Sequence, residues 1–166
     1  MILMTGAIRL AQASFPKARH HLITTELGRN ALGSLGLDSI IVFDKKGTSS
    51  SIGGILKVRR ELNKALTSRE GAILLQAHRS YRSCLLAMIL NISTIAYEEA
   101  DFNPLATVKV PRIATLHESA RYGLLLEPLG ISREKILTAK QWLQKSTIEM
   151  SDTDAWRKEI THFKGS

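Results

Sequence analysis

An apolar run followed at once by a polar, basic run constrains this chain more than any other stretch. Residues 72–77 (AILLQA) have the near-continuous apolar character of a strand buried on both faces, and residues 80–90 have the pattern of a helix. A strand that leads into a helix places the intervening loop at the carboxyl edge of a parallel sheet, where open α/β folds bind ligands. The sequence therefore predicts a ligand-binding loop at residues 78–82.

This loop carries the residue types of an anion site. It reads His78-Arg79-Ser80-Tyr81-Arg82, and the unpaired amides at the start of a helix attract negative charge. Arg79 and Arg82 are three residues apart, so they lie on one helical face. The alternative is structural: Ser80 caps the helix and the two arginines form a solvated face. From these residues alone both interpretations stay open.

Strand-like and helix-like segments alternate along most of the chain. We expect strands at residues 19–25, 39–43, 72–76, 94–97 and 135–137, and helices at 2–14, 26–32, 52–66, 80–90, 114–129 and 152–162, with an irregular connection at 98–112. Such alternation predicts an α/β fold with a parallel, doubly wound sheet that includes Leu22, Val42 and Leu74.

The composition fits a folded domain in a reducing compartment. The chain has 166 residues, of which 44% are hydrophobic and 23% charged. No apolar run approaches the roughly 18 residues that span a bilayer, and residues 1–6 lack the features of a signal peptide. A single cysteine, Cys84, excludes an internal disulfide and is expected to be a buried structural thiol. We therefore expect a cytoplasmic location.

The charge balance favours an anionic partner. Lys and Arg number 23 against 15 Asp and Glu, which gives a net charge of +8. Aromatic residues make up only 5% and form no stripe interleaved with basic residues, so nucleic acid is not the expected partner. The charge itself favours a polyanion or an anionic membrane surface, and it is compatible with nucleic acid as well as with a phosphorylated glycolipid.

No motif in the chain predicts a metal or a cofactor. His117-Glu118-x-x-Arg121 lacks the second histidine of a zinc helix, and His20-His21 has no other ligand near it in sequence. The glycines do not form a dinucleotide fingerprint after a strand. We therefore expect neither a bound metal nor a resident cofactor.

The run HRSYRSCLL at residues 78–86 resembles glycosyltransferase family 9, the family of the lipopolysaccharide heptosyltransferases. Other segments resemble the same family in the same order: TGAIRL at 5–10, SFPKA at 14–18, IIVFD at 40–44, VPR at 110–112, LHESARY at 116–122 and LLEPLGI at 125–131. The resemblance extends over roughly residues 5–131.

The resemblance implies the acceptor-side, N-terminal half of a GT-B enzyme with a three-layer Rossmann-like domain. Residues 1–131 would form an incomplete acceptor domain, and residues 132–166 a linker or helical tail toward a donor domain. Family members begin with a strand and a Gly-Asp loop, so the expected catalytic Asp would precede Met1 and no residue here inherits its role. We therefore expect a chain truncated at both ends, with the first strand missing.

The same resemblance implies an activity and a binding site. The full enzyme would transfer heptose from an ADP-sugar donor to the phosphorylated inner core of lipopolysaccharide, without a metal, in peripheral contact with the anionic inner-membrane surface. This chain alone is expected to be inactive. Two rivals remain: a basic α/β module that binds nucleic acid or another polyanion, and a folded remnant without activity. The residues expected to bind the acceptor are Thr5 and Gly6, which would line the first loop, and His78, Arg79, Ser80, Arg82, His117 and Arg121.

Overall fold

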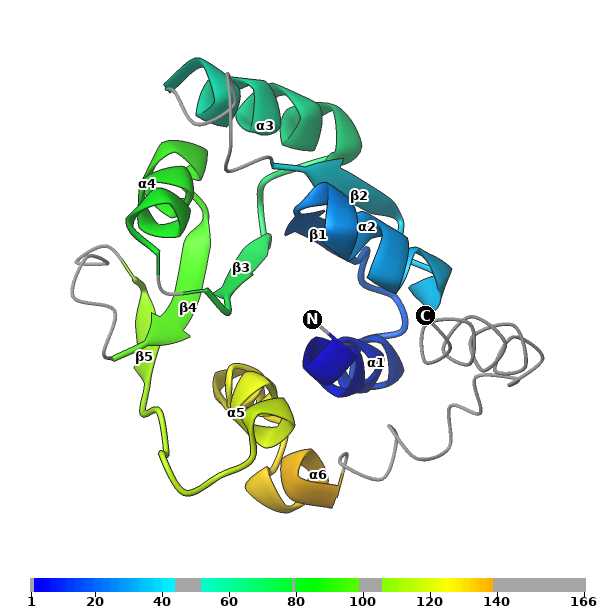
Figure 1. The fold of residues 1–166 in the computed structure, drawn as a ribbon, viewed down its shortest axis with the longest axis vertical. Coiled ribbons are helices and arrows are strands. Elements are labelled where there is room, and N and C mark those ends of the chain that lie inside the picture. The colour runs from blue at the N-terminus through cyan, green and yellow to red at the C-terminus, as the bar shows by residue number, and fades with distance from the viewer. Residues whose placement is uncertain (1, 44–51, 79, 99–105, 139–166) are drawn as a thin grey trace, which may run out of the picture.

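The computed structural model describes residues 2–43, 52–78, 80–98 and 106–138, and it has an α/β fold (Figure 1). The helices are α1 (Thr5–Ser14), α2 (Glu26–Leu32), α3 (Ile52–Ala65), α4 (Tyr81–Leu90), α5 (Glu118–Leu124) and α6 (Arg133–Thr138), and the strands are β1 (His21–Thr24), β2 (Ser39–Val42), β3 (Ile73–Gln76), β4 (Ser93–Tyr97) and β5 (Val108–Val110). Short 3-10 helices cover Ile2–Met4, Gly33–Leu35 and Glu127–Leu129. The predicted α/β class is confirmed.

The strands pair in parallel, but they form two sheets. One sheet has the order β1-β2 and the other β3-β4-β5. Leu22 pairs with Ile40 and Val42 with Thr24 in the first sheet, whereas Leu74 pairs with Thr94 in the second. The prediction of parallel pairing is confirmed, and the prediction that Leu22, Val42 and Leu74 share one sheet is wrong. The reason is that no strand in the described residues pairs with both β1 and β3.

Helices cover both faces of the strands, so the expected three-layer arrangement is confirmed (Figure 1). An apolar cluster under α3 and α4 includes residues of both sheets: Ile41, Phe43, Ile55, Val58, Leu62, Leu86 and Leu90, with Ile23 and Leu74 packed against it. A second cluster joins α1, α5 and α6 to the three-stranded sheet: Leu10, Ala11, Ile95, Tyr97, Val110, Leu124, Leu125, Leu126, Ile131 and Ile136. The two sheets are therefore two parts of one middle layer.

Three segments differ from the sequence prediction. The expected irregular connection contains β5, whose three residues are too few for a clear alternation signal. The helix expected at 114–129 begins only at Glu118, because His117 caps it, and a separate 3-10 turn containing Pro128 follows it. Residues 135–137, expected as a strand, lie in α6, where Ile136 packs against α5. The helix expected at 152–162 lies outside the described residues.

Candidate functional site

The predicted binding loop lies at the carboxyl edge of the three-stranded sheet. Parallel pairing sets Gln76 beside Ala96 and Tyr97 beside Val110, so β3, β4 and β5 end at the same edge. The β3–α4 loop and the connection from β5 to α5 therefore both leave the sheet on this side. This edge is where open α/β sheets bind ligands.

Side chains within the β3–α4 loop fix its shape. Gln76 is buried, and its amide Nε2 donates to the carbonyl of His78 at 3.2 Å and to Cys84 Sγ at 3.2 Å. His78 Nδ1 accepts a hydrogen bond from the backbone N–H of Ser80 at 3.2 Å, and the His78 side chain is exposed. Cys84 is 1% exposed, so the prediction of a buried thiol is confirmed.

Ser80 is the N-cap of α4. Its Oγ accepts a hydrogen bond from the backbone N–H of Ser83 at 3.2 Å, and its backbone is extended. The structural alternative for Ser80 is thereby confirmed. Arg82 is exposed on the first turn of α4, whereas Arg79 lies outside the described residues. An anion-binding role for this turn stays a prediction.

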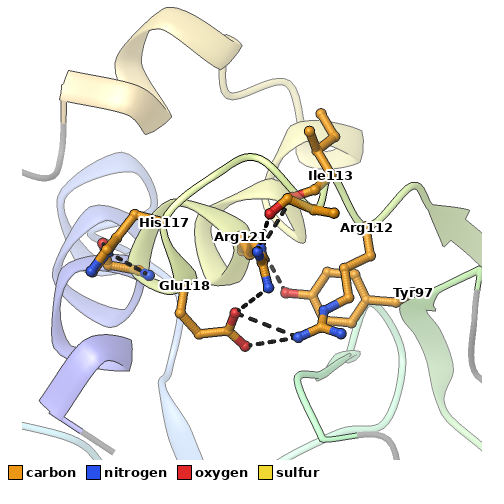
Figure 2. A network of polar contacts seen from close by, with 8 residues as sticks. Tyr97, Arg112, Ile113, His117, Glu118 and Arg121 are labelled. Atoms are coloured by element: carbon orange, nitrogen blue, oxygen red, sulfur yellow. Dashed lines mark hydrogen bonds and ion pairs between the residues drawn. The ribbon is translucent and has the colours of Figure 1, made fainter.

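A polar network holds the start of α5 against the segment that follows β5 (Figure 2). Glu118 accepts hydrogen bonds from Arg121 at 2.7 Å and from Arg112 at 3.2 Å. Arg121 also donates to the carbonyl of Ile113 at 3.0 Å and to that of Ala114. The sequence did not predict that Arg121 holds the segment after β5 against α5 through these hydrogen bonds. The i,i+3 spacing of Glu118 and Arg121 was the only local signal for it.

Tyr97 and His117, which lie at the two ends of this network, also form hydrogen bonds within the protein. Tyr97 Oη, at the end of β4, donates to the carbonyl of Arg121 at 2.8 Å, and burial raises the pKa of Tyr97 well above its ordinary value. His117 Nδ1 accepts a hydrogen bond from the backbone N–H of Ser119 at 3.3 Å, and it lies 2.7 Å from Ser119 Oγ (Figure 2). His117 and Arg121 therefore stabilise the fold, and their expected contact with an acceptor stays a prediction.

Thr5 and Gly6 lie in the first turn of α1, within the helix expected at 2–14. Gly6 is buried, and Leu10 and Ala11 of the same helix belong to the core. The 3-10 turn Ile2–Met4 continues directly into this helix, and the expected contact of Thr5 and Gly6 with an acceptor stays a prediction.

A groove of ≈ 450 Å³ lies at the opposite edge of the same sheet. It is lined by residues at the amino ends of the strands, among them Ile73, Ser93 and Val108. It is therefore not part of the loop site at the carboxyl edge.

None of the helices in the described residues is long and apolar enough to span a bilayer. The same residues contain no cluster of three or more His, Cys, Asp or Glu side chains that could hold a metal ion.

Comparison with known proteins finds a similarity to a solved structure. No family model and no curated protein matches the chain. The structure is similar to the crystal structure of the glycosyl transferase family 9 from Veillonella parvula DSM 2008, with a TM-score of 0.71 and 26% sequence identity. The match covers 79% of this chain and 38% of that one, so the chain spans well under half of that protein's length. The resemblance to glycosyltransferase family 9 that the sequence motifs indicate is therefore confirmed.

Proposed function

We propose that this chain is the acceptor-binding part of a glycosyltransferase of family 9. The observation that supports the proposal most is the similarity to the Veillonella parvula structure, at a TM-score of 0.71 and 26% identity over 79% of the chain. The order of the segments that resemble the family, from residue 5 to residue 131, supports it independently of the structure.

The finer proposal concerns the sugar and the acceptor. The donor is an ADP-heptose and the acceptor is the phosphorylated inner core of lipopolysaccharide. Support comes from the HRSYRSCLL run at residues 78–86 and from the net charge of +8, which suits an anionic glycolipid. Because such an acceptor is anchored in a bilayer, peripheral contact with the anionic inner-membrane surface belongs to the same proposal.

The loop after β3 is the part of the chain that would meet the acceptor. Ser80 holds the start of α4, and the exposed guanidinium of Arg82 supplies a planar pair of donors to a phosphate or carboxylate. His78 is exposed in the same loop, and its Nδ1 accepts a hydrogen bond from the backbone N–H of Ser80. Arg79, between these residues in sequence, would add a second cation.

Binding of a phosphorylated core oligosaccharide tests this proposal directly. A charge-assisted hydrogen bond from an arginine contributes about 1.5–3 kcal/mol, so Arg82→Ala should weaken binding tenfold or more. Arg82→Lys should recover only part of the affinity, because lysine keeps the charge without the planar fork. Titration calorimetry with the phosphorylated oligosaccharide, and with the same compound after dephosphorylation, measures both effects.

Arg60→Ala is the matched control, because Arg60 is an exposed arginine on α3 and its loss changes the net charge equally. We expect it to change affinity less than about twofold, as an exposed charge remote from a ligand does. Equal losses for both variants, together with tight and salt-dependent binding to DNA, would instead support the basic module without catalysis.

We expect binding without transfer from this chain alone. The match covers only 38% of the Veillonella parvula protein, and we assign no catalytic carboxylate to the chain. Incubation with ADP-heptose and a heptose-deficient core acceptor should therefore release no ADP above background. Sustained ADP release that depends on the acceptor would contradict this expectation.

A further inference from the structure

A polar side chain is buried at the end of β3, directly before the β3–α4 loop. Gln76 is 7% exposed and is the most buried residue of its strand, whereas the apolar Ile73 at the other end of β3 is 48% exposed. Burying an amide without hydrogen bonds costs free energy, so the contacts of a buried glutamine indicate why it is there.

The amide of Gln76 joins the start of the loop to the helix that follows it. Its Nε2 donates to the carbonyl of His78 and to Sγ of Cys84, both at 3.2 Å. An amide nitrogen carries two N–H groups, so the two acceptors match its two donors. The orientation of the amide is fixed as well, because its oxygen cannot accept a hydrogen bond from a carbonyl.

Further hydrogen bonds connect this pair of contacts to the first turn of α4. His78 Nδ1 accepts from the backbone N–H of Ser80, and the Ser80 carbonyl accepts from the N–H of Cys84 at 3.1 Å. Arg82 lies in this turn and is exposed. The backbone that carries Arg82 is therefore held at both ends by residues that the Gln76 amide joins.

We propose that Gln76 is a positioning residue for acceptor binding. It holds the β3–α4 loop in the conformation in which the guanidinium of Arg82 meets the anionic group of the acceptor. The inference rests on the proposed function, because it requires an acceptor at this loop. Gln76 is buried and acts through the loop, not by contact with the acceptor. A loop that is ordered before binding loses less conformational entropy on binding, so loosening it lowers affinity although every contacting group remains.

Gln76→Leu removes the amide at a similar side-chain volume and leaves His78 and Arg82 in place. We expect it to weaken binding of the phosphorylated core oligosaccharide about fivefold or more, as the loss of one or two neutral hydrogen bonds does. In the Arg82→Lys background the same change should weaken binding less than about twofold, because a point charge on a flexible stem tolerates a displaced backbone better than a planar fork does. Equal losses in the two backgrounds would overturn the proposal.

Thr94→Val is the matched control for lost stability. Thr94 is 2% exposed, and its Oγ1 donates to the carbonyl of Ile92 at 2.8 Å, at the amino end of β4. Each variant loses a buried donor to a nearby carbonyl, so both should lower the free energy of unfolding. Only Gln76→Leu should lower affinity, and an equal loss of affinity in both variants would show that Gln76 acts through stability alone.

Amide hydrogen exchange tests the loop without any acceptor. The N–H groups of Ser83 and Cys84 bond to Ser80 in the first turn of α4, where exchange proceeds through local opening. They should exchange about fivefold faster or more in Gln76→Leu and at an unchanged rate in Thr94→Val. An unchanged rate in Gln76→Leu overturns the proposal whether or not the oligosaccharide binds.

The binding data separate this inference from the proposed function. Failure of the unmodified chain to bind the phosphorylated oligosaccharide would contradict the proposed function, and the positioning role would fall with it. Equally tight binding by the unmodified chain and by Gln76→Leu would overturn the positioning role alone and leave the proposed function in place.

Discussion

Replacing Glu118 by alanine should destabilise the protein through two arginines at once. The carboxylate accepts from Arg112 at 3.2 Å and from Arg121 at 2.7 Å (Figure 2). The three side chains are 32%, 25% and 19% exposed, in the order Glu118, Arg112, Arg121. Truncation leaves two partly buried guanidinium groups without this shared carboxylate, and it loosens the segment between β5 and α5.

The expected cost lies between those of exposed and buried ion pairs. Exposed pairs contribute up to about 1 kcal/mol, and removing one partner of a fully buried pair costs about 3–5 kcal/mol. For side chains exposed by a fifth to a third, we expect about 2 kcal/mol for the variant. In a protein of this size that corresponds to a fall in Tm of about 4–8 °C.

Thermal and urea unfolding followed by circular dichroism measure this change. Glu61→Ala is the control: its carboxylate lies 4.0 Å from Lys57 Nζ, and the Lys57 and Glu61 side chains are 73% and 41% exposed. The control should lose less than about 0.5 kcal/mol. Equal Tm values for the two variants would refute the structural role of the network. A double-mutant cycle between Glu118 and Arg112 should give a coupling energy above about 0.5 kcal/mol.

Two further changes probe packing and pH dependence. Gly123→Ala places a Cβ 2.6 Å from Ile136 Cγ2, so it should lower the free energy of unfolding by about 1–3 kcal/mol through the contact of α5 with α6. Gly33→Ala is the control, because no atom lies within 4 Å of its new Cβ, and it should not lower the urea midpoint. The Asp38 carboxylate accepts from the backbone N–H of His20 at 2.7 Å, which lowers the pKa of Asp38 below its ordinary value of 3.8. Its stabilisation is therefore present above the ordinary value and lost as pH falls through the folded value, so Asp38→Asn should lower the urea midpoint at about pH 7, and this difference should shrink as the pH falls below 3.8. A pH-independent difference would contradict this assignment.

The elements predicted well from the sequence are those with strong local signals. The strand at 72–76 and the helix after Ser80 follow from an apolar run, a capping residue and helical spacing, and the structure has β3 at Ile73–Gln76 and α4 at Tyr81–Leu90. In contrast, Ile136 lies in a short apolar run that fits a strand as well as a helix. Its helical state depends on packing against Gly123, a contact that no local pattern reveals.

The candidate site was likewise predictable from the sequence only in part. The position of the β3–α4 loop at the carboxyl edge follows from the order of strand and helix alone. The roles of His117 and Arg121 do not, because the cap requires α5 to begin at Glu118, and the bonds from Arg121 to the carbonyls of Ile113 and Ala114 require the folded turn before α5. Backbone groups are the partners of both side chains, and because no residue type marks such partners, His117 and Arg121 are easily assigned to a ligand.

Helix capping and acceptor binding at the start of α4 use different atoms. The Ser80 carbonyl accepts from the N–H groups of Ser83 at 2.9 Å and Cys84 at 3.1 Å, and the Ser80 hydroxyl accepts from Ser83 as well, so the cap is made by Ser80 and the backbone. The exposed Arg82 side chain takes no part in those bonds. Because the cap is made without the Arg82 side chain, Arg82→Ala should leave the cap in place and lower acceptor affinity. A fall in Tm at unchanged affinity would instead assign Arg82 to the fold.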